Sequence, residues 1–396
     1  MKKIWKALAA CLLSVALAAC GSGASESEAA PSAASPELFC VNVGKGDALI
    51  LRVGGWRGLI DAGKPWAMGR VRGAMEVMGI DALDAVFLTH TDKDHAGGLE
   101  WLAAGDIPVG AWYASGYYTD VKEDGHPAVE AAGARGQRVN WLTRGDVLPL
   151  GDTGAVLRVL APFELSTDKD DNNSLVMMLE TDQGRMLLTG DMELPEEAGL
   201  LKQGDDLSCD VLKAPNHGDS DTLSQAFARA AGADLAVIST DSYEKPGTPD
   251  PGVLARLKEA GTQVRVTQDA GLGVWVTLAG GVPEVRDVPF PEDEAQGLSI
   301  EGVYPGDDLI VMKNDGPDRD MTGWYLFSEK GNELFAFPEG TLFPSGGTLT
   351  VGTLSSNEGS YDLLWNDKKV IHQKKADGIT LYDRYGRAAD RRGNGL

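Results

Sequence analysis

The residues best suited to chemistry lie in one short polar segment of this 396-residue chain. The segment reads Thr89-His90-Thr91-Asp92-Lys93-Asp94-His95 and follows an apolar run that is typical of a buried strand. Two imidazoles and two carboxylates this close together are costly unless a cation neutralises the clustered charge. The chain has only five histidines, and two of them lie here. The segment therefore predicts a metal site on a loop at the end of a rigid strand.

Alternating strand and helix patterns are expected to position this loop. Over 38–61, short apolar runs separated by glycine turns predict a strand meander, which is followed by helical spacing over 66–78 and a buried strand over 84–89. Further strands are predicted near residue 157 and over 175–180, 186–188, 211–213, 235–239 and 264–267, with helices over 194–201, 223–231 and 252–260. This order favours an α/β domain in which two sheets are sandwiched between helices.

The composition changes near residue 282. Residues 282–297 are rich in proline and acidic side chains and predict a linker, whereas 298–392 read as short strands separated by Gly, Asp and Asn turns. This pattern predicts an all-β sandwich as a second domain. The first domain would then span 37–281.

The amino terminus has the pattern of an export signal. Three lysines precede an apolar run over 7–19 that is too short to span a bilayer. The run ends at Leu17-Ala18-Ala19-Cys20, which is similar to the lipobox of bacterial lipoproteins. We expect 1–19 to be a signal peptide, Cys20 to be lipidated, and the Gly/Ser/Ala/Pro-rich stretch 20–36 to be a flexible tether. The mature protein would be extracytoplasmic and lipid-anchored to a bacterial membrane.

The charge of the chain is strongly acidic, with one local exception. The formal net charge of −23 disfavours polyanions through long-range repulsion. Between residues 368 and 392, however, eight Lys or Arg stand against three Asp. The usual explanation is a solvated strand face, and the alternative is a docking surface for an anionic polymer such as single-stranded DNA or a wall polymer.

The metal-site loop resembles a known family. His90-x-Asp92-x-Asp94-His95 resembles the HxHxDH signature of the metallo-β-lactamase superfamily, and specifically its ComEC-like competence-protein branch, in which the second His is Asp. Five more motifs follow the family order: VGKGDA over 43–48, LIDAG over 59–63, DNNSLV over 171–176, LTGD over 188–191 and LKAPNHG over 212–218. The resemblance runs over about 39–276 and implies an αββα sandwich. The sequence departs from the family at four positions: Lys45 stands where the family usually has Gln, Asn42 where it has Asp, Asn216 where it has the first His of HHG, and Thr248 where it often has a His before Pro.

The same resemblance implies two divalent metal ions bridged by Asp191. One ion would be held by Asp94, His95, Asp191 and His217. The other would be held by His90, Asp92 and Asp191, with water, substrate or Asn173 completing the set. Three Asp and three His make a more oxygen-rich site than an all-His zinc site. Because oxygen ligands favour manganese relative to zinc, manganese is the first expectation and zinc the second.

Catalytic or supporting roles are expected for six residues. Asp94 would accept a proton from the attacking water while it remains a ligand, and Lys213 would contact the substrate anion unless it is a solvated strand end. Asp61 would act from behind the ligands, as the family's motif implies. The remaining candidates for support or substrate contact are Asp47, Asn173 and Ser174.

The second domain resembles a lamin-tail domain, which has an immunoglobulin-like β-sandwich fold. The motifs that carry this resemblance are TGW over 322–324, FPEG over 337–340 and LYD over 381–383. Trp324 and Trp365 are expected to be core aromatics rather than a stacking platform for a ligand.

Three functions fit these expectations. The first is a surface-anchored, metal-dependent phosphodiesterase or nuclease with an anionic substrate. The second is hydrolysis of a phosphorylated wall component or another small ester on the same scaffold. The third is a non-catalytic surface binding protein with a vestigial metal site, since one fold hosts many chemistries.

Overall fold

The computed structural model describes residues 35–119, 121–291, 295–357, 359 and 361–395. The predicted signal peptide, Cys20 and most of the predicted tether lie outside this part of the chain, so their roles stay predictions. None of the helices in the described part is long and apolar enough to cross a membrane.

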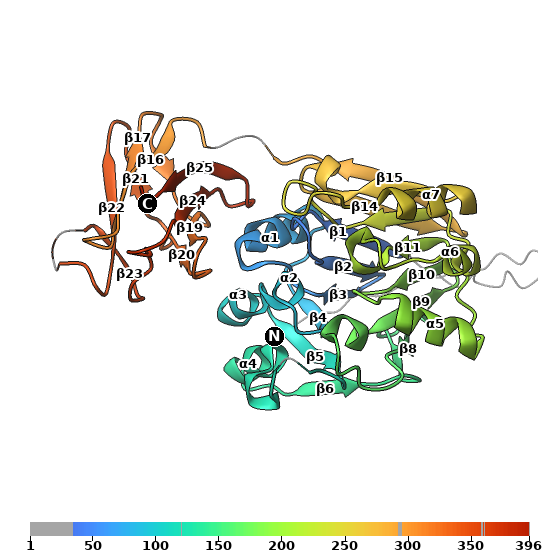
Figure 1. The fold of residues 1–396 in the computed structure, drawn as a ribbon. Coiled ribbons are helices and arrows are strands. Elements are labelled where there is room, and N and C mark those ends of the chain that lie inside the picture. The colour runs from blue at the N-terminus through green and yellow to red at the C-terminus, as the bar shows by residue number, and fades with distance from the viewer. Residues whose placement is uncertain (1–34, 120, 292–294, 358, 360, 396) are drawn as a thin grey trace, which may run out of the picture. The chain divides into compact units, whose positions relative to one another are not determined.

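Two mixed sheets lie face to face in the first domain (Figure 1). The strands of the first sheet follow the order β15 (Val282–Val288), β14 (Gly273–Ala279), β1 (Glu37–Val41), β2 (Leu49–Val53), β3 (Trp56–Ile60), β4 (Leu83–Leu88), β5 (Val109–Ser115) and β6 (Val139–Leu142). Those of the second follow the order β13 (Gln263–Val266), β12 (Leu235–Ile238), β11 (Val211–Lys213), β10 (Gly184–Leu188), β9 (Val176–Thr181), β8 (Val156–Ala161) and β7 (Val147–Pro149).

Helices cover the outer face of each sheet. Against the first sheet lie α1 (Met68–Val77), α2 (Lys93–Ala96), α3 (Leu99–Ala104) and α4 (Pro127–Ala134), and against the second lie α5 (Leu194–Gln203), α6 (Gln225–Ala231) and α7 (Pro251–Ala260). Short 3-10 turns link these elements: η1 (Pro65–Ala67), η2 (Glu123–Gly125), η3 (Asp170–Asn173), η4 (Pro215–Gly218) and η5 (Thr267–Ala270).

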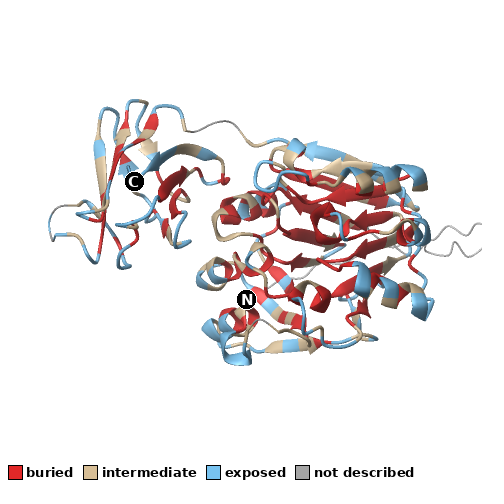
Figure 2. Ribbon diagram, in the orientation of Figure 1, coloured by how far each residue is buried: buried red, intermediate tan, exposed pale blue. Residues whose placement is uncertain are grey.

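Three apolar layers hold the domain together, as the burial pattern in Figure 2 shows. Successive side chains of a strand point to opposite faces, and β1 shows this alternation. Phe39 and Val41 pack under α1 in the first layer, whereas Leu38 and Cys40 lie in the layer between the sheets. In the second sheet, Leu187 packs toward α5 and α6 in the third layer. The predicted αββα sandwich is confirmed.

Parallel pairing brings the candidate metal ligands to one edge. β3, β4 and β5 are parallel neighbours, and so are β10, β11 and β12. The carboxyl ends of parallel strands meet at the same edge of a sheet. The loops that follow β3, β4, β10 and β11 carry Asp61, His90, Asp191 and His217 respectively.

The predicted linker is wrong over its first half. Residues Val282–Val288 form β15, which pairs with β14 in antiparallel register along its whole length. β15 is the edge strand of the sheet, and this position tolerates Pro283. The acidic side chains of β15 are exposed to water. The first domain therefore extends at least to Val288.

The second domain is a β-sandwich of two four-stranded sheets. One sheet has the order β16 (Leu298–Tyr304), β17 (Leu309–Asn314), β22 (Thr348–Thr353) and β23 (Leu363–Trp365), and the other has β20 (Leu334–Ala336), β19 (Tyr325–Ser328), β24 (Gly378–Tyr382) and β25 (Ala388–Gly393). A short pair joins β18 (Arg319–Asp320) to β21 (Leu342–Phe343). Trp324 and Trp365 are buried in the core, as predicted. The resemblance to a lamin-tail domain stays a prediction.

Candidate metal centre

Asp61 fixes the orientation of the first ligand. Its carboxylate lies behind the segment 89–95, here called the metal loop. Its Oδ1 accepts from the backbone N–H of Thr89 at 2.8 Å, and its Oδ2 lies 2.7 Å from Nδ1 of His95. With Nδ1 held by this carboxylate, Nε2 of His95 is the nitrogen that faces the opposite side. The predicted supporting role of Asp61 agrees with this geometry.

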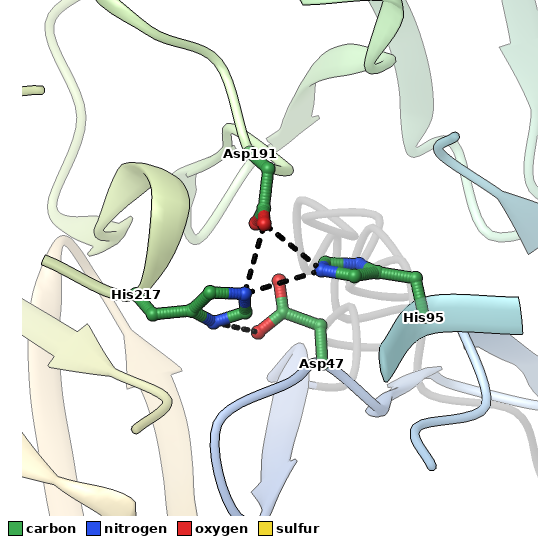
Figure 3. Close-up of side chains that lie close together, drawn as sticks. All are labelled: Asp47, His95, Asp191 and His217. Atoms are coloured by element: carbon green, nitrogen blue, oxygen red, sulfur yellow. Dashed lines mark hydrogen bonds and ion pairs between the residues drawn. The ribbon is translucent and has the colours of Figure 1, made fainter. Parts of the chain in front are cut away.

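His217 is aimed at the same point from the second sheet. Its Nδ1 lies 2.8 Å from the carbonyl oxygen of Ser239, so its Nε2 faces inward. The two Nε2 atoms of His95 and His217 are 3.3 Å apart, and Oδ2 of Asp191 lies 3.2 Å from the first and 2.8 Å from the second (Figure 3). Two imidazole lone pairs and a carboxylate oxygen that converge in this way form a ready ligand set for a divalent cation.

The charges at this point are strongly coupled. Burial alone would lower the pKa of His95, but the carboxylates of Asp191 and Asp61 raise it well above its usual value. Burial would raise the pKa of Asp191, but the imidazoles of His217 and His95 hold it well below its usual value. His95, His217 and Asp191 together therefore favour a positive charge between them. A bound metal ion would supply that charge while both imidazoles stay neutral.

Two aspartates compete for the fourth position. Oδ2 of Asp94 lies 3.7 Å from Nε2 of His217, on the inward side, and the side chain of Asp94 is 21% exposed. Asp47 also lies within the cluster, but its Oδ1 is 3.9 Å from Nδ1 of His217, the nitrogen already held by Ser239. Asp94 therefore fits the predicted ligand set better than Asp47.

Lys213 does not have the role that the sequence suggested. Its side chain is fully buried, its ammonium pairs with the carboxylate of Asp47, and it donates to the carbonyl oxygen of Gly190 at 3.1 Å. An ammonium that is closed off from solvent cannot contact a substrate anion, and it is not a solvated strand end either. Because Nζ also lies 3.8 Å from Oδ1 of Asp191, Lys213 acts as an internal counter-ion beneath the metal centre.

A second cluster lies beside the first. It consists of His90, Asp92 and Asp171, with Nε2 of His90 3.9 Å from a carboxylate oxygen of each aspartate. Burial, followed by the charges of Asp191 and Asp92, raises the pKa of Asp171 to about 7. In the described structure, Nε2 of His90 and Oδ1 of Asp191 are both buried without a hydrogen-bond partner. The orphaned Nε2 of His90, beside the carboxylates of Asp92 and Asp171, fits a second cation next to the first site.

Asn173 does not complete the second cluster. Its Oδ1 accepts from the backbone N–H of Ser166 at 2.8 Å, and its Nδ2 donates to the carbonyl oxygen of Ser166 and to Asp170. Asp171, which the sequence reasoning passed over, is the residue that reaches His90. The available signal was its carboxylate, since an anionic oxygen is a stronger metal ligand than an amide.

Two further residues hold the ligand loops in place. Oγ of Ser174 accepts from the backbone N–H of Asp191 and lies 3.1 Å from Nδ1 of His90, which agrees with its predicted support role. Asp170, not predicted, is buried and accepts from the backbone N–H and hydroxyl of Thr91 and from the backbone N–H of Thr119. It ties η3 to the metal loop.

Lys45 lies at the open side of the centre. Its Nζ is 3.6 Å from Oδ2 of Asp94, and its backbone N–H donates to Glu244 at 2.9 Å. The family's usual Gln would place no charge here, so this chain adds a cation next to a ligand carboxylate.

Comparisons with known proteins agree with this description. Residues 42–242, about half of the chain, match the family described as the metallo-beta-lactamase superfamily. The chain is 28% identical to ComE operon protein 3 of Bacillus subtilis (strain 168) over 253 residues, covering 59% of this chain and 32% of that protein. It is 26% identical to Competence protein ComA of Neisseria gonorrhoeae over 247 residues, covering 62% and 33%. The metallo-beta-lactamase fold protein YhfI from Bacillus subtilis aligns with a TM-score of 0.39 at 15% identity, over 59% of this chain and 96% of that chain.

These matches confirm the resemblance to ComEC-like competence proteins that the motifs predicted. The chain spans about a third of the length of these curated relatives.

Proposed function

The chain belongs to the metallo-β-lactamase superfamily, and on this basis we propose that it is a metal-dependent phosphodiesterase or nuclease of the ComEC-like branch. The observation that supports the proposal most is the position of Asp191. Its Oδ2 lies 3.2 Å from Nε2 of His95 and 2.8 Å from Nε2 of His217, and its buried Oδ1 has no hydrogen bond but lies 3.8 Å from the Lys213 ammonium. Asp191 would therefore hold one cation together with His95 and His217, and the His90 cluster would hold a second.

When bound, two such cations would activate a water and stabilise charge on the oxygens of a phosphoryl group. We assign Mn²⁺ first and Zn²⁺ second, because carboxylates make up most of the two clusters.

The protein's own groups have distinct tasks in this proposal. Asp61 and the Ser239 carbonyl hold the two imidazoles in the tautomer that leaves Nε2 free. Asp94 is the partly exposed carboxylate of the centre, so it is the group placed to take a proton from an attacking water. Lys213 and Asp47 neutralise each other beneath the centre.

The substrate and the location of the protein are part of the same proposal. One of the curated relatives, Competence protein ComA of Neisseria gonorrhoeae, carries competence in its name, which favours nucleic acid as the anionic substrate. We also propose that lipidation of Cys20 anchors the protein to the outer side of a bacterial membrane, which the Leu17-Ala18-Ala19-Cys20 sequence supports.

Turnover by the metal-loaded protein tests the proposal. Purified protein is freed of metal, reloaded with Mn²⁺ or Zn²⁺, and assayed on bis-p-nitrophenyl phosphate, single-stranded DNA, a carboxylic ester and a lactam. We expect metal-dependent hydrolysis of the two phosphodiesters that Asp191→Asn reduces by about 10²-fold or more, while Asp152→Asn, at an exposed turn, leaves it unchanged.

Two other results would contradict the proposal. Turnover of only the ester or the lactam would favour the small-ester alternative. Full metal binding without turnover of any substrate would favour a non-catalytic binding protein.

A further inference from the structure

One loop of the β-sandwich presents an unusual concentration of positive charge. Residues 366–376, here called the lysine loop, connect β23 to β24. The loop carries four exposed lysines, Lys368, Lys369, Lys374 and Lys375. Asp367 is its only exposed acidic residue.

These lysines differ from two of the other cations in the same domain. Lys313 pairs with Asp315, and Arg391 pairs with Glu329. In the described part of the chain, none of the four loop ammonium groups forms an ion pair. A cluster of unpaired cations in a chain of net charge −23 leaves a local positive field that internal carboxylates do not cancel.

The loop is built rigidly although its lysines are exposed. Val370 and Ile371 anchor its centre in the sandwich core. The buried carboxylate of Asp377 accepts from the backbone N–H groups of His372 and Lys330. The side-chain amide of Asn394 donates to the carbonyl oxygens of His372 and Lys375. A pinned backbone lowers the entropy that the loop would lose on binding a ligand.

We propose that the lysine loop binds the phosphodiester backbone of single-stranded nucleic acid. Ammonium groups bind phosphates as point charges, and two lysine doublets on one rigid loop can engage successive phosphates of a flexible strand. A membrane surface fits less well, because the large apolar side chains of the loop are buried in the core rather than available for insertion. The choice of nucleic acid over other phosphodiester polymers rests on the function proposed above.

Equilibrium binding of the full chain tests the loop without any need for turnover. A fluorescent single-stranded DNA of about 30 nucleotides is titrated in the presence of a chelator, and the affinity is measured by anisotropy between about 20 and 200 mM salt. The loop variant replaces all four lysines by Gln. The matched control removes the same charge at exposed positions of the first domain, with Lys122, Arg138, Lys202 and Lys258 each replaced by Gln.

We expect the log-log salt slope of the loop variant to be smaller by about 3, since each phosphate contact on a single strand contributes roughly 0.7. Its affinity at about 50 mM salt should fall by roughly tenfold or more, and the control variant should retain most of the affinity and the slope. Both variants should keep the wild-type melting temperature, since all eight side chains are exposed.

Three outcomes would overturn the proposal: no salt-dependent DNA binding by the wild-type chain, an equal loss in the two variants, or loop-dependent binding to phosphatidylglycerol vesicles but not to DNA. A failure here would leave hydrolysis by the metal centre untouched, because the chelator keeps that activity out of the measurement.

Discussion

The buried pair of Lys213 and Asp47 offers a sharp test of how the metal centre is supported. Both side chains are fully buried, and the two opposite charges neutralise each other. Burial by itself would lower the pKa of Lys213, but the carboxylates of Asp47 and Asp191 raise it, so the lysine is charged. Replacing Lys213 by Met leaves the Asp47 carboxylate buried without a counter-ion. Breaking a buried pair in this way costs about 3–5 kcal/mol.

The double variant separates the pair from simple packing. Asp47→Asn alone should cost less than Lys213→Met, because Lys213 keeps Asp191 at 3.8 Å and its hydrogen bond to Gly190. When Lys213→Met and Asp47→Asn are combined, no buried charge is stranded at Asp47. The double variant should therefore be more stable than the sum of the two single effects predicts, by about 2 kcal/mol.

Urea unfolding of the metal-free proteins measures these free energies directly. Lys258→Met, at an exposed position of α7, is the control and should change stability by less than about 0.5 kcal/mol. If Lys213→Met costs no more than this control, or if the double variant is strictly additive, the counter-ion reasoning is wrong. Metal content adds a check, because loss of metal in Asp47→Asn as complete as in Asp191→Ala would make Asp47 a ligand.

Three further predictions follow from the described groups and from the sequence. Asp191→Ala should lose most bound metal by elemental analysis, whereas Asp171→Asn should lose only the ion of the His90 cluster; equal retention in both would refute the bridging role. Burial raises the pKa of Glu196 to about 7, so folding stability should fall as pH rises from about 4.5 to about 7. Glu196→Gln should remove this fall, because it removes the buried charge, and should stabilise the protein at pH 8. The gain should be only about 1 kcal/mol, because water screens a partly exposed carboxylate. An unchanged pH profile in urea unfolding would count against this prediction. Cys20→Ser should abolish lipid labelling and membrane partitioning, and identical partitioning of both forms would exclude the anchor.

Much of the metal centre was predictable because its ligands are close in sequence or lie at strand ends. His90 and Asp92 lie in the loop after β4 and Asp94 and His95 lie in α2 directly after it, and the carboxyl ends of parallel strands necessarily share one edge of a sheet. Asp171 was harder to predict, because it lies in η3, between β8 and β9 of the second sheet, whereas His90 follows β4 of the first sheet.

The burial of Lys213 could have been inferred from strand alternation. Val211 points into the layer between the sheets and Leu212 points outward toward the helices. Alternation places Lys213 on the side of Val211, between the two sheets. A lysine there must find a carboxylate, and only the tertiary structure shows that Asp47 is the partner.

The failed linker prediction has a different cause. Proline and acidic residues are typical of linkers, but they are also tolerated on an exposed edge strand. The difference is decided by a pairing partner, and β14 pairs with β15 across the whole strand. Composition alone does not contain that information.

Two kinds of physical anomaly occur in and around the metal centre, independently of any motif. Asp61, Asn216 and His217 have φ values of 58°, 39° and 54°, a left-handed conformation that costs non-glycine residues about 1–3 kcal/mol each. Nε2 of His90 and Oδ1 of Asp191 are buried without a hydrogen-bond partner, although such atoms are normally satisfied. Strained backbone and orphaned polar atoms persist only where the surrounding fold enforces them. Imidazoles and carboxylates converge on shared points in the metal centre, and a bound cation would stabilise this arrangement.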